Sequence, residues 1–330
     1  MAQVTRDMLD LDFIIQQLFL GTSYTEIARL ESHRLSADGE LEATRNHIAG
    51  IHRDLKRGAL RATQQKRIDA KYIPTYIWGV EKDNGGLPLF IGHPEIDGDA
   101  VIVSDVHAPF TDYNFAEKPN EVGEHYGVKT LITAGDLLDS GTQNKFRKKV
   151  RPPTFSTDLE VGRRLLEYWA DWFDTIWFEP GNHDDWFLEN EDGDIDINDM
   201  YHLLRGDSLR GKFIVTPYDR ITLNSSGELW TIPHQAENSV NSLTVGEKLA
   251  WKYQTNMIVP HQHNHADGYD RYGRYIIVDI GGLHDENKMA YMTLKTSTRP
   301  KFDKSFAVVK DGGYAIITPD RRHLNSRNFI

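Results

Sequence analysis

The stretch Glu179-Pro-Gly-Asn-His-Asp-Asp185 directly follows a short apolar run, Thr175-Ile-Trp-Phe178. A buried strand followed by a turn with an amide, an imidazole and two carboxylates is costly, because polar groups at a strand end must find partners or water. The stretch is also compatible with an ordinary exposed turn, since short motifs arise by chance. The rest of the chain decides between these two interpretations.

Four other apolar runs end in a similar way, each followed at once by side chains that can bind a cation. The clusters are Ser104-Asp-Val-His107 after Ala100–Val103, Gly135-Asp-Leu-Leu-Asp139 after Thr130–Ala134, Pro233-His-Gln235 after Leu229–Ile232, and Pro260-His-Gln-His263 after Met257–Val259. The carboxyl ends of strands in an open α/β sheet meet at one crevice, where ligands bind. The five clusters together therefore predict one site that holds two cations.

The ordered set D-x-H, G-D, G-N-H-D, H and H-x-H resembles the signature of the calcineurin-like metallophosphoesterases, from about Asp99 to Leu283. The resemblance implies an α/β fold, a four-layer αββα sandwich of two mixed sheets, with two divalent ions. By motif position, one ion would be held by Asp105, His107 and His263, the other by Asn182, His234 and His261, and Asp136 would bridge both.

The resemblance also implies catalytic roles within the opening stretch. His183 would face the scissile phosphate without binding a cation, and would protonate the leaving oxygen. We expect Asp184 to orient that imidazole and raise its pKa, and Asp139 to support Asp136 or the other ligands from behind. A hydroxide bridging the two cations would attack the phosphorus in line.

The donor types narrow the choice of cation. The chain has no cysteine, which excludes thiolate ligands and disulfides. Mixed nitrogen and oxygen ligands suit Mn²⁺, and also Fe, Zn²⁺ or Ni²⁺, better than Mg²⁺ or Ca²⁺. Two neighbouring cations repel each other, so a shared carboxylate is needed between them. We expect two divalent ions, with Mn²⁺ favoured.

Two positions depart from the usual family pattern. Pro260 replaces the glycine before the last His-x-His, and Gln235 replaces the glycine after His234. A second ligand pair, His263 with His265, is also open. We favour His261 with His263 because both come directly after the predicted strand.

The N-terminal part of the chain has a helical pattern. An apolar stripe at helical spacing begins at Leu11, Ser23-Tyr-Thr-Glu26 is a capping box, and another stripe extends from Leu41 to Leu55. With the basic segment Arg45–Lys71, these helices resemble a helix-turn-helix module. We expect a small helical domain at 1–75, a connecting arm at 76–98 and the phosphoesterase domain at 99–330.

The composition is that of a globular protein, with 39% apolar and 26% charged residues. No apolar run approaches the roughly 20 residues that span a bilayer. The N-terminus lacks the layout of a secretory signal, so we expect a cytoplasmic protein that does not contact membranes. Oligomerisation is left open. The net charge of −11 restricts any contact with nucleic acid to a local basic segment.

The residues after the second and third motifs bear on the substrate. Phosphoprotein phosphatases of this family typically carry an arginine where this chain has Ser140, and no arginine follows the third motif in Asp185-Trp-Phe187. A diester is therefore favoured over a monoester. The leading hypothesis is a phosphodiesterase or nuclease acting on nucleic acid, with DNA favoured, bound through the basic N-terminal segment.

Two alternatives come from different classes of function. One is a hydrolase of small molecules, either a cyclic-nucleotide phosphodiesterase or a phosphatase, whose N-terminal helices serve oligomerisation. The other is a DNA-binding regulator with a vestigial metal site, which the complete ligand set disfavours.

Overall fold

The computed structural model describes residues 9–10, 13–14, 23–35, 41–56, 80–82, 88–90, 92–143, 150–190, 196–205, 209, 211–234, 237, 239, 241–294 and 302–319. The chain divides into two compact units, Met1–Pro74 and Thr75–Ile330. Gln235, Leu11, residues 76–79, 83–87 and 91 of the predicted arm, and the basic segment beyond residue 56 lie outside the described residues.

The smaller unit contains helices α2 (Tyr24–Arg34) and α3 (Leu41–Lys56). Ser23 caps α2 as predicted, because its hydroxyl accepts a hydrogen bond from the Glu26 N–H at 3.3 Å. The Glu26 carboxylate binds Arg29 instead of completing the capping box. Ile27 on α2 packs with Ile48 and Ile51 on α3 in one buried cluster. The predicted N-terminal helical region is therefore present.

The larger unit contains two six-stranded mixed sheets and a two-stranded one, β1 (Val80–Lys82) with β2 (Pro88–Phe90). The first large sheet has the order β14 (Gly313–Ile317), β13 (Phe306–Lys310), β4 (Ala100–Val103), β5 (Thr130–Ala134), β6 (Thr175–Glu179) and β7 (Phe213–Val215). The second has the order β11 (Ala266–Tyr269), β12 (Ile276–Asp279), β10 (Asn256–Val259), β9 (Glu228–Pro233), β8 (Arg220–Ser225) and β3 (Glu95–Asp97).

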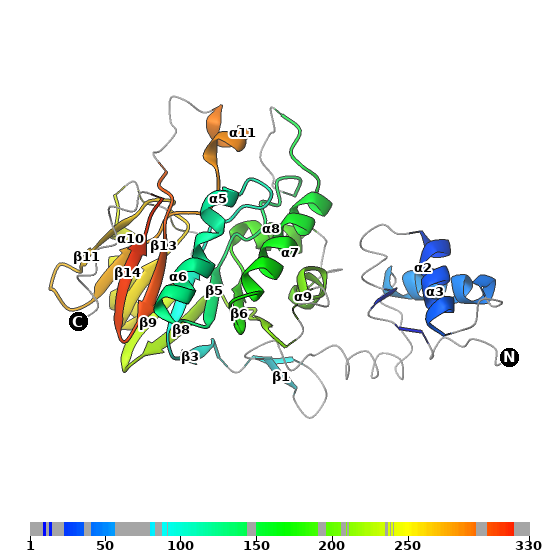
Figure 1. Cartoon of the computed structure of the whole chain (residues 1–330), viewed down its shortest axis with the longest axis horizontal. Helices are drawn as coiled ribbons and strands as arrows, with labels where there is room; N and C mark the ends of the chain where they lie inside the picture. Colours follow the sequence, from blue (N-terminus) through cyan, green and yellow to red (C-terminus); the bar gives the residue numbers. More distant parts are fainter. Residues whose placement is uncertain are drawn as a thin grey trace. The chain divides into compact units, whose positions relative to one another are not determined.

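Helices cover the outer faces of both large sheets (Figure 1). Those against the first sheet are α5 (Tyr113–Ala116), α6 (Lys118–Tyr126), α7 (Phe155–Ala170), α8 (Asn182–Asn190) and α9 (Ile197–Arg205). Helix α10 (Thr244–Tyr253) packs on the second sheet, and η3 (Glu286–Lys288) and α11 (Ala290–Thr293) follow β12. The layers run helix, sheet, sheet, helix, which confirms the predicted αββα sandwich.

The central strands are apolar on both faces because both faces are covered. In β4, Ala100 and Ile102 face the second sheet, whereas Val101 and Val103 face the helices. The bounds predicted for β4 and β5 match the structure. Helix α7 begins at Phe155 because the Thr154 hydroxyl caps it, accepting a hydrogen bond from the Thr157 N–H. Among the described residues, no helix combines the length and apolar character needed to cross a membrane.

Candidate metal centre

The loops after β4 and β5 lie side by side because the two strands are parallel neighbours. Their pairing continues past the strand ends. The Asp105 N–H donates to the Gly135 carbonyl at 3.2 Å, and the His107 N–H donates to the Asp136 carbonyl at 3.0 Å. The two motif loops are thereby held in register, with Asp105 and Asp136 both buried at the same end of the sheet.

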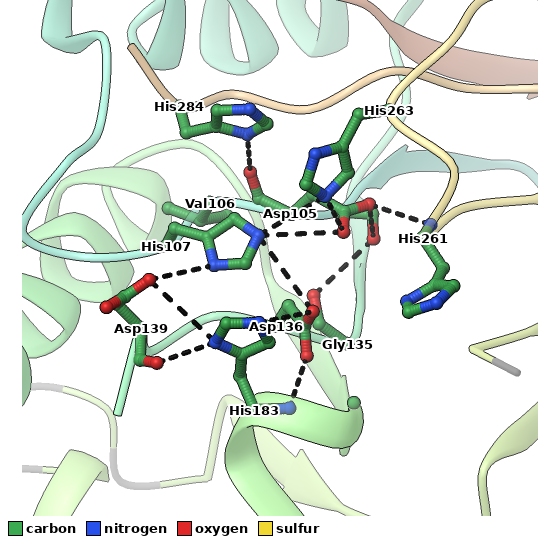
Figure 2. A network of polar contacts seen from close by, with 12 residues as sticks. Asp105, Val106, His107, Gly135, Asp136, Asp139, His183, His261, His263 and His284 are labelled. Atoms are coloured by element: carbon green, nitrogen blue, oxygen red, sulfur yellow. Dashed lines mark hydrogen bonds and ion pairs between the residues drawn. The ribbon is translucent and has the colours of Figure 1, made fainter. Parts of the chain in front are cut away.

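Three predicted ligands gather with Asp136 in what we call the first cation site: Asp105, His107 and His263 (Figure 2). His263 Nε2 lies 2.9 Å from Asp105 Oδ1 and 3.3 Å from His107 Nε2. His107 Nε2 lies 3.9 Å from Asp136 Oδ2. Ligand atoms that each stand about 2.0–2.2 Å from one cation are separated by about 3 to 3.5 Å, so these spacings fit a shared ion.

The other predicted ligands are Asn182, His234 and His261. His234 and His261 gather with the same Asp136 in what we call the second cation site, and Asn182 directly precedes His183, whose N–H donates to Asp136. His234 Nε2 lies 3.3 Å from Asp136 Oδ2, and His261 joins this pair within 4.8 Å. The Asn182 amide oxygen and both ring nitrogens of His261 are buried without a hydrogen-bond partner among the described residues. Such atoms are costly unless something outside the chain binds them, and their donor types fit a divalent cation.

Hydrogen bonds fix which imidazole nitrogen faces the centre. His234 Nδ1 donates to the Ala134 carbonyl at 2.7 Å, which leaves Nε2 as the nitrogen that can bind a cation. The His234 N–H donates to the Glu179 carboxylate at 2.7 Å. A Cβ on Gly135 would lie 2.1 Å from His234 Nδ1, so this glycine is required for the imidazole to reach its place.

His183 lies beside both sites and faces them (Figure 2). Its main-chain N–H donates to Asp136 Oδ1 at 2.8 Å. Its ring Nδ1 donates to the Asp139 carbonyl at 2.6 Å, while Nε2 stands 4.0 Å from Asp136 Oδ2. Nε2 is thus the nitrogen available to a substrate bound over the centre.

The structure corrects the role expected for Asp184. Its carboxylate accepts hydrogen bonds from the Gly181 N–H at 2.9 Å and the Leu138 N–H at 3.3 Å, so it joins two motif loops. Successive residues on a helix point in different directions, which carries Asp184 away from the imidazole before it. Asp139 contacts that ring instead, with its carboxylate 3.8 Å from His183 Nδ1. Burial and the nearby Asp136 raise the pKa of Asp184 to about 7.

The charges of the centre suit cation binding. Burial alone would raise the pKa of Asp105 and Asp136, but neighbouring imidazoles hold the pKa of both carboxyls well below its ordinary value. Burial lowers the pKa of His107 and lowers that of His261 to about 4. Burial also opposes protonation of His234, yet the Asp136 carboxylate raises its pKa to about 10. Ionised carboxylates therefore stand beside neutral His107 and His261, and a cation at the second site must displace the His234 proton.

Five of the predicted ligands have left-handed backbone conformations that non-glycine residues rarely adopt: Asp105, His107, Asp136, His261 and His263, with φ between 46° and 74°. Such strain is concentrated at functional sites, where surrounding contacts hold it in place. His261 follows Pro260 and takes a φ of 74° itself, so the family glycine missing there is not needed for the turn.

The two candidate histidine pairs are separated by where their side chains lie. His263 contacts Asp105, and His261 lies with Asp136 and His234. His265 is exposed, and its Nδ1 lies 3.5 Å from the Asp303 carboxylate. The structure therefore brings His261 and His263 to the centre and turns His265 away from it.

His284 is a buried residue of the centre that the sequence analysis missed. Its Nδ1 donates to the Asp105 carbonyl at 2.9 Å. Its ring centroid lies 4.4 Å from that of His263 and 5.1 Å from that of His107. The signal was present, because Gly281-Gly-Leu-His284 follows the apolar end of β12 as the other clusters follow their strands.

One known family matches the part of the chain that forms this centre. Calcineurin-like phosphoesterases match residues 100–291, more than half of the chain. Similar solved structures include an archaeal phosphodiesterase with 14% identity, covering 67% of this chain and 99% of that one, with a TM-score of 0.37. A hypothetical protein from Pyrococcus horikoshii OT3 has 9% identity, coverage of 67% and 87%, and a TM-score of 0.41. Zinc-bound Vps29 from Entamoeba histolytica has 10% identity, coverage of 66% and 89%, and a TM-score of 0.35. No curated protein matches the chain.

Proposed function

The chain belongs to the calcineurin-like phosphoesterase family, and we propose that it is a phosphodiesterase that uses two divalent cations to hydrolyse nucleic acid. One observation carries the proposal. The Asp136 carboxylate lies within reach of imidazoles from both cation sites, and the His183 Nε2 stands 4.0 Å from it. A phosphate bound over Asp136 would meet both cations and an imidazole at once.

The side chains divide the work of hydrolysis. When bound, the two cations supply Lewis-acid activation of water and of the phosphate. The Asp136 carboxylate lies near imidazoles of both cation sites and would hold both cations. His183 gives its Nδ1–H to the Asp139 carbonyl, so Nε2 is the atom that holds a proton for the leaving oxygen. The Asp139 carboxylate lies 3.8 Å from Nδ1, on the same side of the ring as the carbonyl that orients it.

The charge around the centre favours a diester. The side chains with the largest effects on the pKa of Asp105 and Asp136 are aspartates and histidines. The position at which family phosphatases carry an arginine is occupied by the buried Ser140. A monoester carries two negative charges, so an added cationic side chain strengthens its binding. A diester carries one negative charge, which the two cations can neutralise without such a side chain.

The basic segment supports nucleic acid as the substrate. Arg45 is exposed on α3, and Arg53 and Lys56 lie further along the same helix. Phosphate contacts from such residues supply affinity that does not depend on base sequence. Because the whole chain carries a net charge of −11, these contacts would be local and sensitive to salt.

A substrate panel tests this function. The full chain with Mn²⁺ would be offered bis(p-nitrophenyl) phosphate, p-nitrophenyl phosphate, cyclic nucleotides, and single- and double-stranded DNA. We expect hydrolysis of the chromogenic diester and of DNA, with little of the monoester. If no substrate of the panel were hydrolysed, the proposed phosphodiesterase activity would be refuted.

A charge variant tests the role of α3 separately. We expect Arg45→Ala, Arg53→Ala and Lys56→Ala together to weaken DNA hydrolysis at physiological salt while leaving bis(p-nitrophenyl) phosphate unaffected. Equal rates on DNA with and without these changes, together with activity on cyclic nucleotides, would favour the small-molecule hydrolase instead. Exposed Arg164 on α7, paired with Glu160, offers a matched control for loss of a surface charge.

A further inference from the structure

Trp186 and Phe302 lie at the two ends of a row of rings that crosses the metal centre. The ring centroids are 4.0 Å apart for Trp186 and His183, and 4.5 Å apart for His183 and His107. The row continues from His107 to His263 at 5.2 Å and from His263 to Phe302 at 4.8 Å. The three imidazoles belong to the centre, whereas the indole and phenyl rings offer no atom for a cation.

The two terminal rings are held on opposite sides of the centre's row of imidazoles. Trp186 follows Asn182 by four residues on α8, so both lie on the same face of that helix, and its ring packs on His183. Phe302 directly precedes Asp303, whose N–H donates to the His263 carbonyl at 2.7 Å. Trp186 therefore lies beside His183, whereas Phe302 lies beside His263 of the first cation site. Both are only half-buried, so part of each ring is accessible next to the bound phosphate.

We propose that Trp186 and Phe302 stack on the two nucleobases that flank the scissile phosphate, so that the preferred substrate is a linear, single-stranded nucleotide diester. This inference rests on the proposed function. Aromatic side chains stack on any base, because every base has a π-face. A base that stacks on the protein cannot also stay in a duplex, which favours single strands.

The chemistry assigns one ring to each product. In hydrolysis, a water oxygen bonds to phosphorus as the bond from phosphorus to the leaving oxygen breaks. A proton passes from His183 Nε2 to the leaving oxygen, and the proton that the water loses restores the imidazole through solvent. Trp186, next to His183, would contact the leaving nucleoside. Phe302, at the far end of the row, would contact the nucleoside that keeps the phosphate. A cyclic nucleotide has one base and would engage a single ring.

Three dinucleotides test the inference on the Mn²⁺-loaded full chain: thymidylyl-thymidine and the two analogues in which one base or the other is replaced by hydrogen. All three keep the same leaving oxygen. Trp186→Leu is expected to raise KM about tenfold for thymidylyl-thymidine and to leave KM unchanged for the analogue that lacks the base Trp186 contacts. Phe302→Leu is expected to do the same with the other analogue.

Matched variants separate stacking from packing. Trp251→Leu removes a partly exposed tryptophan of α10 outside the row and is expected to change none of the three KM values. Trp186→Phe keeps a stacking face and is expected to retain most of the affinity. Binding of thymidylyl-thymidine to the inactive His183→Ala chain, measured by calorimetry, is expected to weaken about tenfold when Trp186→Leu is added.

The possible failures are distinguishable. If Trp186→Leu and Phe302→Leu slow all three dinucleotides equally, the rings only pack against the imidazoles and the inference is overturned. Hydrolysis of bis(p-nitrophenyl) phosphate without hydrolysis of thymidylyl-thymidine also overturns it, while the phosphodiesterase stands. Failure with both substrates refutes the proposed function itself.

Discussion

The two cation sites share Asp136 but are supported in different ways. In the first site, the His107 and His263 rings contact each other and the buried His284. In the second site, the Asn182 oxygen and both His261 ring nitrogens have no partner among the described residues. The His234 and His261 rings also contact each other, with centroids 5.2 Å apart, but no hydrogen bond within the described residues holds the His261 ring or the Asn182 oxygen, so the second site is the less supported of the two.

This difference has a consequence for cation affinity. A site whose ligands are already in place loses less conformational entropy on binding than one whose ligands must be ordered. The second site must also displace a proton from His234, since the pKa of that imidazole is raised to about 10. We therefore expect the first site to fill at lower Mn²⁺ concentration than the second.

The largest expected effect comes from the residue that both sites share. Asp136→Asn keeps the shape of the side chain but removes the charge that holds two repelling cations together. We expect loss of both bound cations, measured by metal analysis after dialysis, and a fall in diester hydrolysis on the order of 10³-fold. Asp184→Asn, a buried neighbour whose carboxylate binds main-chain amides, is the control and should keep both cations. Retention of one tight cation by Asp136→Asn would show that the sites do not depend on a common carboxylate.

The His183 side chain is predicted to act in catalysis without binding a cation. His183→Ala is expected to lower turnover by about 10²- to 10⁴-fold, because proton donation to the leaving oxygen is lost. Metal analysis of the same variant should still find two cations. If the variant lost a cation, His183 would be a ligand and not the proton donor.

The metal ligands could be predicted from the sequence more readily than the residues that position them. Buried parallel strands such as β4 and β5 read as short apolar runs, and the side chains after them have the types that bind cations. Polar edge strands such as β3 and β11 carry no such run and were not predicted. The contact of Asp139 with His183, in place of Asp184, depends on the direction in which α8 leaves its turn. That direction is set by tertiary packing and cannot be read from residue order.

His284 contacts ligands of the first cation site, so changing it should affect the two sites unequally. His284→Phe keeps a ring against His263 but removes the hydrogen bond to the Asp105 carbonyl. Loss of such a supporting contact typically costs 10- to 100-fold in metal affinity. Calorimetric Mn²⁺ titration should show weakening at one site of the two. His265→Phe is the control, because the His265 imidazole lies near Asp303. This variant should leave both Mn²⁺ affinities unchanged. Equal weakening at both sites would contradict the division.

The smallest expected effect concerns the carboxylates behind the first site. Asp139 Oδ1 lies 3.4 Å from His107 Nδ1, and burial together with Asp139 raises the pKa of Asp158 to about 8. In the unfolded chain Asp158 has an ordinary pKa of 3.8, so the folded state holds a proton that the unfolded state loses between pH 4 and 8. The free energy of unfolding associated with this group therefore falls as pH rises through that window.

Asp158→Asn removes this pH dependence while keeping the side chain's shape. At saturating Mn²⁺, the variant's Tm is expected to exceed that of the natural chain by about 5 °C at pH 8, with the difference vanishing near pH 4. Exposed Asp171, just beyond the end of α7, gives a control, since Asp171→Asn should shift Tm little at either pH. A difference that is the same at both pH values would mean that folding does not shift the pKa of Asp158.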